Sequence, residues 1–185
     1  TRLQGDWSSD VCSSDLCKIK GGFALLFFMM NTPDISDKYP DPPFLINFIS
    51  YGGENSFQGE LVTVKCPNDN SIARELIYQH GNHKVLFIDG EDSNMVALLG
   101  DILAEKALEN NWAAVIINGM VRDVEKLRTI KLPIYARGSC PKKSNKQGLG
   151  QTNVELMIQD ILIKPSYWAY GDENGILISS TKLNL

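Results

Sequence analysis

The chain has 185 residues, of which 43% are hydrophobic and 22% are charged, a balance typical of one globular domain with a sizeable core. Its formal net charge is −4 at pH 7, so the sequence lacks the basic surface that binding to a phosphate backbone requires. These values argue against a second domain and against nucleic acid as a direct partner.

Residues 1–29 are predicted to be a leader outside the folded domain. The stretch DWSSDVCSSDL can be back-translated into a common sequencing-adapter oligonucleotide, which suggests translated adapter followed by upstream sequence read in frame. The domain would then start at Met29 or Met30 and comprise residues 30–185. A rival interpretation is a signal peptide built on the apolar run GGFALLFFMM, but no A-x-A-like cleavage site follows this run. The run is also shorter than the roughly 20 residues that span a bilayer.

The cysteines and histidines of the predicted domain form no recognisable metal or disulfide pattern. Cys66 and Cys140 are far apart and lack C-x-x-C spacing, and the only histidines are His80 and His83. We therefore expect a protein of the reducing cytoplasm, without a membrane partner.

Hydrophobic periodicity and turn residues predict alternating strands and helices. A short helix or turn and an extended segment lead to Gly52-Gly53. The elements expected after it are a strand at 59–66, a helix within 68–82, a strand at 84–90, a helix at 101–111, a strand at 113–119, a short helix at 124–130, a strand at 132–138, a polar basic loop at 140–151 and β-hairpins over 154–180 with a turn at 172–175.

The two apolar strands at 84–90 and 113–119 enclose a helix. The 22 residues between them suffice for a parallel crossover, which needs about a dozen or more. We predict an α/β fold in which a parallel βαβ core, covered on both faces, is extended by antiparallel strands.

Charged residues follow the predicted strands where ligands bind in open α/β sheets, outside the carboxyl ends. Asp89-Gly90, Gly100-Asp101 and Arg122-Asp123 all fall at that edge. The apolar strand AAVIING would then be a rigid mount, and the charges after it would be the site.

The stretch LLGDIL allows two interpretations. One helix could run from Asn94 to Asn110 and tolerate Gly100 inside it, at a cost of roughly 1 kcal/mol relative to alanine. Alternatively, a short segment ends at Leu99 and a helix begins at Gly100-Asp101, which leaves the amides of the first turn free to bind an anion. The Arg-Asp pair after the next strand favours the second interpretation.

Arg122 and Asp123 also allow a structural interpretation, as a partly buried ion pair or as charges that open a short helix capped by Asp123. The weakness of this interpretation is that adjacent residues often point apart, so a mutual salt bridge is not the obvious use of both. If both serve a ligand, Arg122 offers a planar fork for a carboxylate or enolate oxygen. Asp123 offers hard oxygens for a divalent cation that keeps most of its waters.

Several segments carry a family resemblance: FQGELVTVKCPNDN, KVLFIDG, ALLGDILAEKALENNWAAVIINGMVRDVEKL, IYARGSCPKKS and YGDENGILIS. On them, from about Ile35 to Ser179, the sequence resembles the RraA-like family. This family includes 4-hydroxy-4-methyl-2-oxoglutarate aldolase/oxaloacetate decarboxylases and regulators of ribonuclease E activity. The most specific piece is Asp101, then twenty residues, then Arg122-Asp123.

The resemblance implies a homotrimeric, metal-dependent class II-type pyruvate aldolase with a swivelling β/β/α-type fold and a small 2-oxo acid substrate. It implies that backbone amides at Gly100, Asp101, Ile102 and Leu103 line the substrate carboxylate, that Arg122 binds substrate, and that Asp123 holds Mg²⁺ or Mn²⁺. The chemistry agrees, because cleavage of a 4-hydroxy-2-oxo acid or decarboxylation of oxaloacetate leaves pyruvate enolate, whose negative charge a cation and Arg122 can stabilise. Asp101 could move protons directly or through a water.

The sequence departs from the family pattern in places. GEDSNMVALL stands where a glycine- and arginine-rich loop is expected, and Gln151 follows GLG where an acidic residue is frequent. No clear C-terminal acidic ligand is visible. These differences bear on substrate scope more than on the core chemistry.

Two competing functions remain open. Lys65, at the end of the strand LVTVK, could form a Schiff base, although an ordinary strand-end lysine is the simpler interpretation. A non-catalytic, protein-binding regulator of ribonuclease E activity is the other alternative, because a fold does not choose between the two roles. We interpret Lys142, Lys143 and Lys146 as a solvated basic loop.

Overall fold

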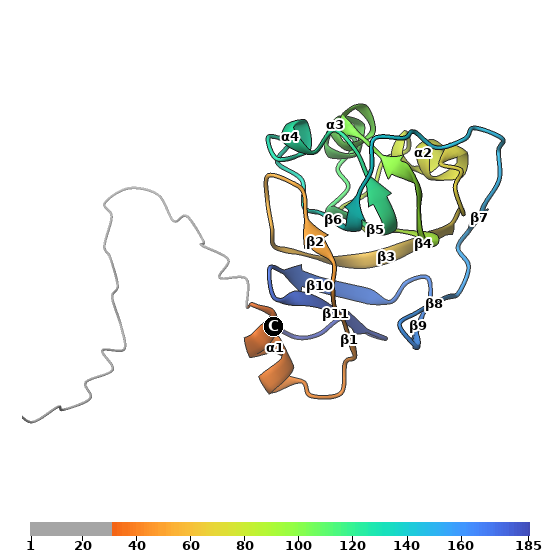
Figure 1. Ribbon diagram of the computed structural model, residues 1–185. Coiled ribbons are helices and arrows are strands. Elements are labelled where there is room, and N and C mark those ends of the chain that lie inside the picture. Colours follow the sequence, from red (N-terminus) through yellow and green to blue (C-terminus); the bar gives the residue numbers. More distant parts are fainter. Residues whose placement is uncertain (1–30) are drawn as a thin grey trace, which may run out of the picture.

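The computed structural model describes residues 31–185 (Figure 1). The predicted leader over residues 1–29 and the expected start at Met29 or Met30 lie outside the described residues.

Helices and strands alternate through the middle of the chain, as the periodicity predicted. The helices are α1 (Thr32–Lys38), α2 (Ser71–Ile77), α3 (Asp101–Glu109) and α4 (Val124–Leu127). The strands are β1 (Phe44–Leu45), β2 (Ile49–Ser50), β3 (Phe57–Lys65), β4 (Val85–Leu99), β5 (Ala114–Val121), β6 (Ile134–Ser139), β7 (Gln151–Thr152), β8 (Leu156–Ile158), β9 (Ile161–Ile163), β10 (Trp168–Asp172) and β11 (Gly175–Ser179).

One long strand joins a parallel part of the main sheet to an antiparallel part. The strand order is β1-β11-β10-β3-β4-β5-β6-β2. The first half of β3 pairs antiparallel with β10, and its second half pairs parallel with β4. Strands β4, β5 and β6 continue the parallel pairing. The prediction of a mixed α/β domain with a parallel core and added antiparallel strands is confirmed.

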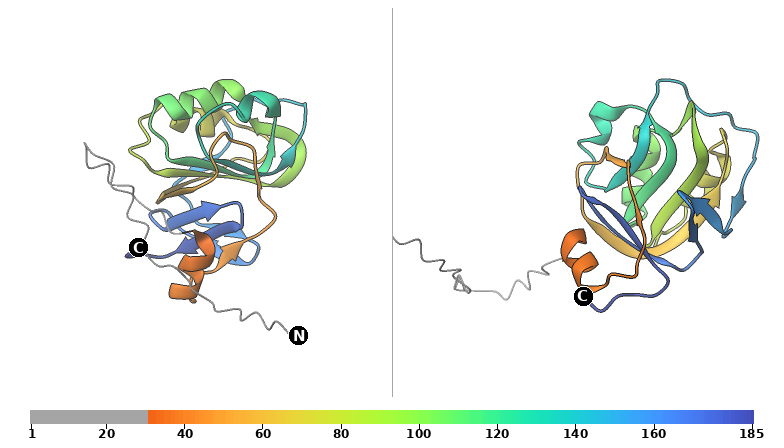
Figure 2. Two further views of the ribbon diagram at one scale, coloured as in Figure 1. Left: turned by 90° about the vertical axis from the view of Figure 1, so that its left-hand side faces the viewer. Right: turned by 60° about the horizontal axis from the view of Figure 1, so that its bottom comes forward.

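The parallel strands are buried on both faces. Helices α2, α3 and α4 lie on one side of them, and the hairpin β10–β11 with α1 lies on the other (Figures 1 and 2). Along β5, Val115 and Ile117 belong to the core under the helices, whereas Ile116 belongs to the core against the hairpin. Because successive side chains of a strand point to opposite faces, burial on both faces requires an unbroken apolar run.

Past Gly90 the structure differs from the prediction. We expected a strand to end at Asp89-Gly90, but β4 continues to Leu99. Its pairing with β5 shifts register three times after Asp89, and Glu91 and Asp92 adopt left-handed backbone with φ of 56° and 54°. Extra residues can be inserted as bulges without ending a strand, so turn-like residues here stay within the sheet.

The C-terminal hairpins form where they were predicted. Strand β10 ends at Asp172 and β11 begins at Gly175, and Asp172 Oδ1 accepts a hydrogen bond from Asn174 N at 2.8 Å across the turn. The same carboxylate accepts the hydroxyl of Thr32 at 2.7 Å, so it also fixes the start of α1 against the hairpin.

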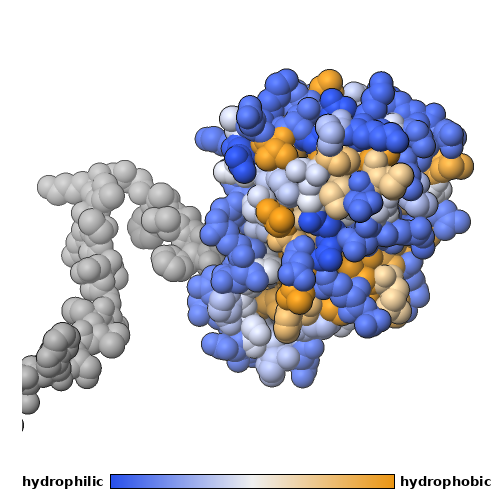
Figure 3. All heavy atoms as spheres, in the orientation of Figure 1, coloured by the Kyte–Doolittle hydropathy of each residue, from blue (hydrophilic) through white to orange (hydrophobic). Residues whose placement is uncertain are grey.

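On the face of the molecule shown in Figure 3, hydrophobic residues reach the surface in separate patches among hydrophilic ones. Among residues 31–185, no helix combines the length and the apolar character needed to cross a lipid bilayer.

The glycine at position 52 is predicted to be indispensable for stability. A Cβ there would lie 1.9 Å from Leu132 O and 2.9 Å from Ile134 N, both backbone atoms that cannot yield locally. We expect Gly52→Ala to lower the free energy of unfolding by about 2 kcal/mol or more in urea titrations. In Gly138→Ala the new methyl group would meet the flexible end of Met120, so this control should lose about 1 kcal/mol or less. Equal losses in both variants would contradict the prediction.

Candidate functional site

A cavity of about 190 Å³ lies where β4 and β5 leave the sheet. All six residues proposed for the site line it: Gly100, Asp101, Ile102, Leu103, Arg122 and Asp123. The ends of β4 and β5 lie side by side, because Arg122 N donates a hydrogen bond to Leu99 O at 3.0 Å. We call this hollow the site cavity.

Helix α3 points its N-terminus at the site cavity. It begins at Asp101 with Gly100 as N-cap, and residues 94–99 are strand, so the interpretation of one helix from Asn94 to Asn110 is wrong. Within the described chain, the amides of Asp101 and Leu103 have no hydrogen-bond acceptor, whereas Ile102 N donates to Asp101 Oδ1 at 2.8 Å. Free amides and the helix dipole together favour an anion at this position.

Asp101 is held as a carboxylate. Its Oδ2 lies 2.6 Å from Lys126 Nζ, and its side chain is only 17% exposed. The hydrogen bond from the Lys126 ammonium lowers the pKa of Asp101, and the Ile102 amide adds to this effect against the opposing effect of burial. Asp101 is therefore ionised at neutral pH and able to accept a proton from a bound group.

Arg122 and Asp123 form a mutual salt bridge, which is the structural interpretation that their sequence left open. Arg122 Nε lies 3.0 Å from Asp123 Oδ2. Strand alternation no longer applies, because β5 ends at Val121 and Asp123 has a left-handed backbone with φ 59°. Asp123 occupies the N-cap position of α4, but its side chain makes no capping hydrogen bond. In the described structure, neither terminal nitrogen of Arg122 has an acceptor, so the outer edge of the guanidinium is free for a ligand.

Gly100 leaves the space in which the Arg122-Asp123 pair sits. A Cβ at this position would lie 2.7 Å from Asp123 Oδ2 and 3.1 Å from Arg122 Cγ. The backbone of Gly100 is extended, with φ −138° and ψ −173°, so other residues could adopt it. Close approach of the carboxylate, not backbone freedom, explains the glycine.

Asn70 is a site residue that the sequence interpretation missed, since its place just before α2 is typical of a helix cap. Its side chain makes no capping bond; instead Nδ2 donates to Leu98 O at 2.9 Å. This bond turns Oδ1 away from Leu98, and Oδ1 has no partner although it is buried. Asn70 lines the site cavity and is 9% exposed. A buried acceptor without a donor costs about 1–3 kcal/mol, so a ligand that donates a proton would relieve it.

The polar loop after β6 also reaches the site, which its sequence did not reveal. Lys143, Ser144 and Lys146 line the site cavity, and Lys143 lies beside Ala97 near the end of β4. The loop had been interpreted as solvated, and both lysines are indeed exposed, but Ser144 is 7% exposed. Only the contacts of the loop with segments distant in sequence bring Ser144 to the site cavity.

Asp69 fastens this loop to the start of α2. The residue is buried, Oδ1 accepts from Ser71 N at 2.8 Å, and Oδ2 accepts from Gln147 N. Burial acts to raise the pKa of Asp69, but hydrogen bonds from Ser71, Gln147 and Leu149 outweigh it and lower the pKa below its ordinary value.

Asp89 and Lys65 do not join the other strand-end residues. They line a separate hollow of about 300 Å³ with Arg137, because the extension of β4 past Gly90 separates the two. Lys65 Nζ lies 2.9 Å from Glu91 Oε1, and that hydrogen bond raises the pKa of Lys65. A Schiff-base lysine needs a lowered pKa, so the geometry disfavours this mechanism.

The residues of the site cavity fit a hydrated divalent cation. Over residues 31–185, no group of three or more His, Cys, Asp or Glu is placed to hold a metal ion. The cavity instead offers the Asp123 carboxylate, the space left by Gly100 and the unpartnered oxygen of Asn70. Mg²⁺ commonly takes one or two carboxylates, keeps several waters and adds oxygens of the substrate.

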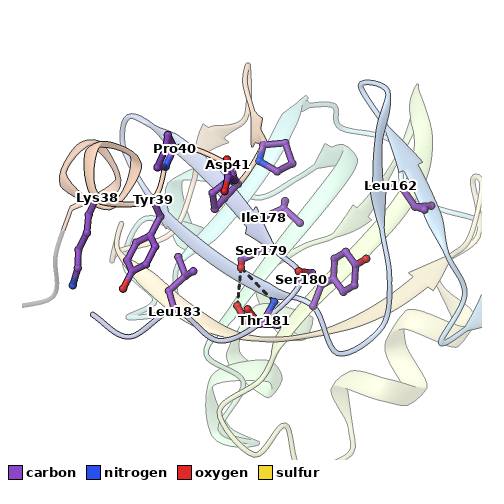
Figure 4. Close-up of a pocket in the computed structure, with 13 residues that line it drawn as sticks. Lys38, Tyr39, Pro40, Asp41, Leu162, Ile178, Ser179, Ser180, Thr181 and Leu183 are labelled. Carbon is purple, nitrogen blue, oxygen red and sulfur yellow. Dashed lines mark hydrogen bonds between the residues drawn. The ribbon is translucent and has the colours of Figure 1, made fainter.

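A larger hollow of about 480 Å³ lies between α1 and the C-terminal segment (Figure 4). In Figure 1, α1 lies at the other end of the domain from α3 and α4, which border the site cavity. The polar groups of the larger hollow are used to fix the chain end: Ser179 Oγ donates to Thr181 O at 2.7 Å, and Tyr39 OH donates to Asn184 O at 2.7 Å. This hollow offers a structural role rather than a reactive group.

Comparison with known proteins shows the family of this chain. The family model RraA-like (Aldolase/RraA) matches residues 32–178. The chain belongs to the RraA-like family.

Relatives of this chain carry different names. A Shewanella oneidensis protein named "Putative 4-hydroxy-4-methyl-2-oxoglutarate aldolase" is 46% identical over 154 residues, which are 82% of this chain and 94% of that protein. The RNA-processing inhibitor RraA from Thermus thermophilis has a similar structure, with a TM-score of 0.82, 36% identity and coverage of 84% of this chain and 96% of that chain. A Geobacillus kaustophilus structure titled S-adenosylmethionine: 2-dimethylmenaquinone methyltransferase is also similar, with a TM-score of 0.81, 36% identity and coverage of 83% and 97%.

Asp69→Asn should destabilise the loop beside the site and the domain with it. The amide cannot accept hydrogen bonds on both sides, so we expect a loss of about 1–3 kcal/mol at pH 7 in urea titrations. Asp92→Asn, which changes an exposed ion pair with Arg137, should cost about 1 kcal/mol or less.

The loss in Asp69→Asn should depend on pH. Because folding lowers the pKa of Asp69, its contribution is present above the ordinary carboxyl value of 3.8 and disappears as the pH falls through the lower folded value. The two stability curves should therefore converge as the pH falls below the ordinary carboxyl value. Parallel curves would show that Asp69 acts through shape alone.

Proposed function

We propose that the protein is a class II-type aldolase that cleaves 4-hydroxy-4-methyl-2-oxoglutarate to pyruvate and also decarboxylates oxaloacetate. The observation that carries the proposal is the meeting of the α3 N-terminus with the Arg122-Asp123 pair in one cavity. The aldolase names of the relatives support the same reaction class. The proposed cofactor is Mg²⁺ or Mn²⁺.

The chain's own groups suit the binding of a 2-oxo acid. The carboxylate would accept hydrogen bonds from the free amides of Asp101 and Leu103, with Ile102 between them in the first turn of α3. The outer nitrogens of Arg122 would then face the 2-oxo oxygen. As the carbon–carbon bond breaks, negative charge develops on that oxygen, and a fixed guanidinium stabilises it without reorganisation.

Two oxygen atoms are available for the proton of the 4-hydroxyl group. Asn70 Oδ1 can accept a hydrogen bond from the hydroxyl, and the Asp101 carboxylate can accept the proton itself or through a water. Lys126 holds the Asp101 carboxylate in one orientation during this step. A divalent cation held by Asp123 would supply Lewis-acid polarisation of the 2-oxo group.

We also propose that the chain assembles as a homotrimer, as the family resemblance implies. Several apolar side chains are largely exposed in the single chain, among them Phe44 (61%), Ile49 (52%) and Met157 (62%). Exposed apolar surface of this kind commonly marks a contact with another protein chain.

A non-catalytic regulator of RNA processing is the second candidate. The observation in its favour is the likeness to an RNA-processing inhibitor, at 36% identity and a TM-score of 0.82. The assembled site cavity favours the aldolase, because an inhibitor that acts by surface contact has no need of an aligned helix N-terminus and Arg-Asp pair.

Loss of either member of the Arg-Asp pair should abolish the reaction. We expect Arg122→Ala and Asp123→Ala to lower pyruvate release from oxaloacetate and from 4-hydroxy-4-methyl-2-oxoglutarate at least about 100-fold, the usual effect of removing a group that stabilises developing charge. EDTA should stop the reaction and Mg²⁺ should restore it. Arg128→Ala, an exposed arginine at the end of α4, should keep the wild-type rate. A folded, metal-supplied wild type that releases no pyruvate would sink the aldolase and leave the regulator.

Gly100→Ala tests the space beside Asp123 without removing a functional group. The new methyl group would displace the Asp123 carboxylate, so we expect pyruvate release to fall about tenfold or more. The stability should change by about 1 kcal/mol or less, because Asp123 is partly exposed and can move. At Gly119 a Cβ would make an ordinary 3.4 Å contact with Leu98, so Gly119→Ala is the matched control and should keep its activity. Full activity in Gly100→Ala would show that the close approach is unimportant.

A further inference from the structure

A row of polar side chains ends the parallel strands on the face of the sheet that meets the hairpin. Asp89 in β4 pairs in register with Lys65 in β3 and with Asn118 in β5. Asp89 and Asn118 each stand two residues after an apolar side chain of the core against the hairpin, Phe87 and Ile116, so strand alternation turns them to the same face. All three polar residues line the hollow of about 300 Å³ described above, which we call the hairpin-face hollow.

Two oxygen atoms of nearly buried side chains face this hollow without a hydrogen-bond donor. Asp89 is 4% exposed and Asn118 is 7% exposed. Asp89 Oδ1 accepts from Glu91 N and from Asn118 Nδ2, both at 2.8 Å, but no donor within residues 31–185 reaches Asp89 Oδ2 or Asn118 Oδ1. In the same part of the chain, Asn70 Oδ1 is the one sealed side-chain polar atom without a partner, so these two oxygens are open to the hollow. Neighbouring acceptors of this kind call for a ligand with several donors.

The carboxylate of Asp89 also lacks a cationic partner. Lys65 Nζ lies 2.9 Å from Glu91 Oε1, and Arg137 Nε lies 3.0 Å from Asp92 Oδ1, so both cations of the hollow are already paired. Over the described residues, no Lys, Arg or His nitrogen lies within 4.0 Å of the Asp89 carboxylate. The hollow therefore carries one negative charge in excess. Because a nearly buried carboxylate without a counter-charge is unfavourable, a cation is the favoured ligand.

The lining of the hollow suits an organic ammonium group better than a metal ion. The carboxylates around it are not placed to share one metal, since no such group of three occurs within residues 31–185. Strand β8 contributes Met157 and Ile158 to the wall, so part of the lining is apolar. An ammonium group has three donors, enough for both Asp89 Oδ2 and Asn118 Oδ1. An aliphatic stem attached to it would cover the apolar wall, as the stem of a lysine does elsewhere.

We propose that the hairpin-face hollow binds a primary ammonium group carried on an aliphatic stem, the chemistry shared by a small alkylamine and a lysine side chain. Asp89 Oδ2 supplies the counter-charge, and Asn118 Oδ1 supplies the second acceptor. The inference does not depend on the proposed function, because neither Asp89 nor Asn118 lines the site cavity.

The test titrates small probes into the full chain and follows the side-chain amide of Asn118 by ¹⁵N NMR at physiological ionic strength. n-Butylammonium should shift this resonance with a Kd of about 1 mM or tighter. 1-Butanol has the same stem without the charge, and tetramethylammonium has the charge without an N–H donor, so each should bind at least about tenfold more weakly. Mg²⁺ at the same concentrations should leave the resonance unchanged.

Asp89→Asn removes the charge but can keep the two hydrogen bonds that Oδ1 accepts, and it should weaken n-butylammonium binding about tenfold or more. Asp160→Asn is the matched control, because Asp160 is an exposed carboxylate in the β8–β9 turn that does not line the hollow, and it should keep the wild-type affinity. Met157→Lys adds a cation to the wall at a side chain that is 62% exposed, so the fold should tolerate it and the affinity should fall about threefold or more. Circular dichroism of each variant would show that the fold is unchanged.

A further probe, Nα-acetyl-lysine N-methylamide, separates the two sources of the ammonium group. Tighter binding of this probe than of n-butylammonium would support a lysine side chain of a protein, and weaker binding would support a free amine. The inference is overturned if n-butylammonium leaves the Asn118 resonance unchanged, or if 1-butanol or Mg²⁺ shifts it equally. It is also overturned if Asp89→Asn or Met157→Lys is folded and keeps the wild-type affinity.

Discussion

The parallel pairing of β4 with β5 is the constraint on which the site depends. Beyond the last paired residues, Arg122 N donates to Leu99 O at 3.0 Å, and both strands end there. Strand β4 leads into α3 through Gly100, and β5 leads through Arg122-Asp123 into α4. A slip of one residue would exchange the faces of the strand and would separate the helix N-terminus from the guanidinium.

Charge in the site is organised in pairs whose outer edges remain free. Arg122 contacts Asp123 through Nε, which leaves its terminal nitrogens available, and Lys126 orients Asp101 from the solvent side. Such pairing fixes the groups before a ligand arrives, so little reorganisation accompanies the reaction that we propose. The same arrangement leaves Asn70 Oδ1 without a donor, a local cost that is understandable where a ligand supplies one.

Stability and function meet at the start of α2. Asp69 fastens the loop after β6, and its neighbour Asn70 bonds to Leu98 O in β4. These contacts hold three segments, far apart in sequence, around one cavity. A change at Asp69 therefore acts on the domain and on the site cavity together.

The sequence by itself determined the strands and helices, because apolar runs such as AVII can be buried on both faces only in a covered parallel sheet. It also placed Gly100, Asp101, Arg122 and Asp123 at strand ends, since the carboxyl ends of neighbouring parallel strands meet at one edge. It could not show that β4 continues past Gly90, because bulges depend on pairing with β5.

Tertiary structure alone decided which other residues reach the site. Asn70 looked like a helix cap and Ser144 like part of a solvated loop, and nothing local distinguishes them from such residues. Their burial arises from hydrogen bonds between segments separated by 28 residues or more, such as Asn70 to Leu98. Contacts of that range are set by how the whole chain packs, so the local pattern around either residue does not contain them.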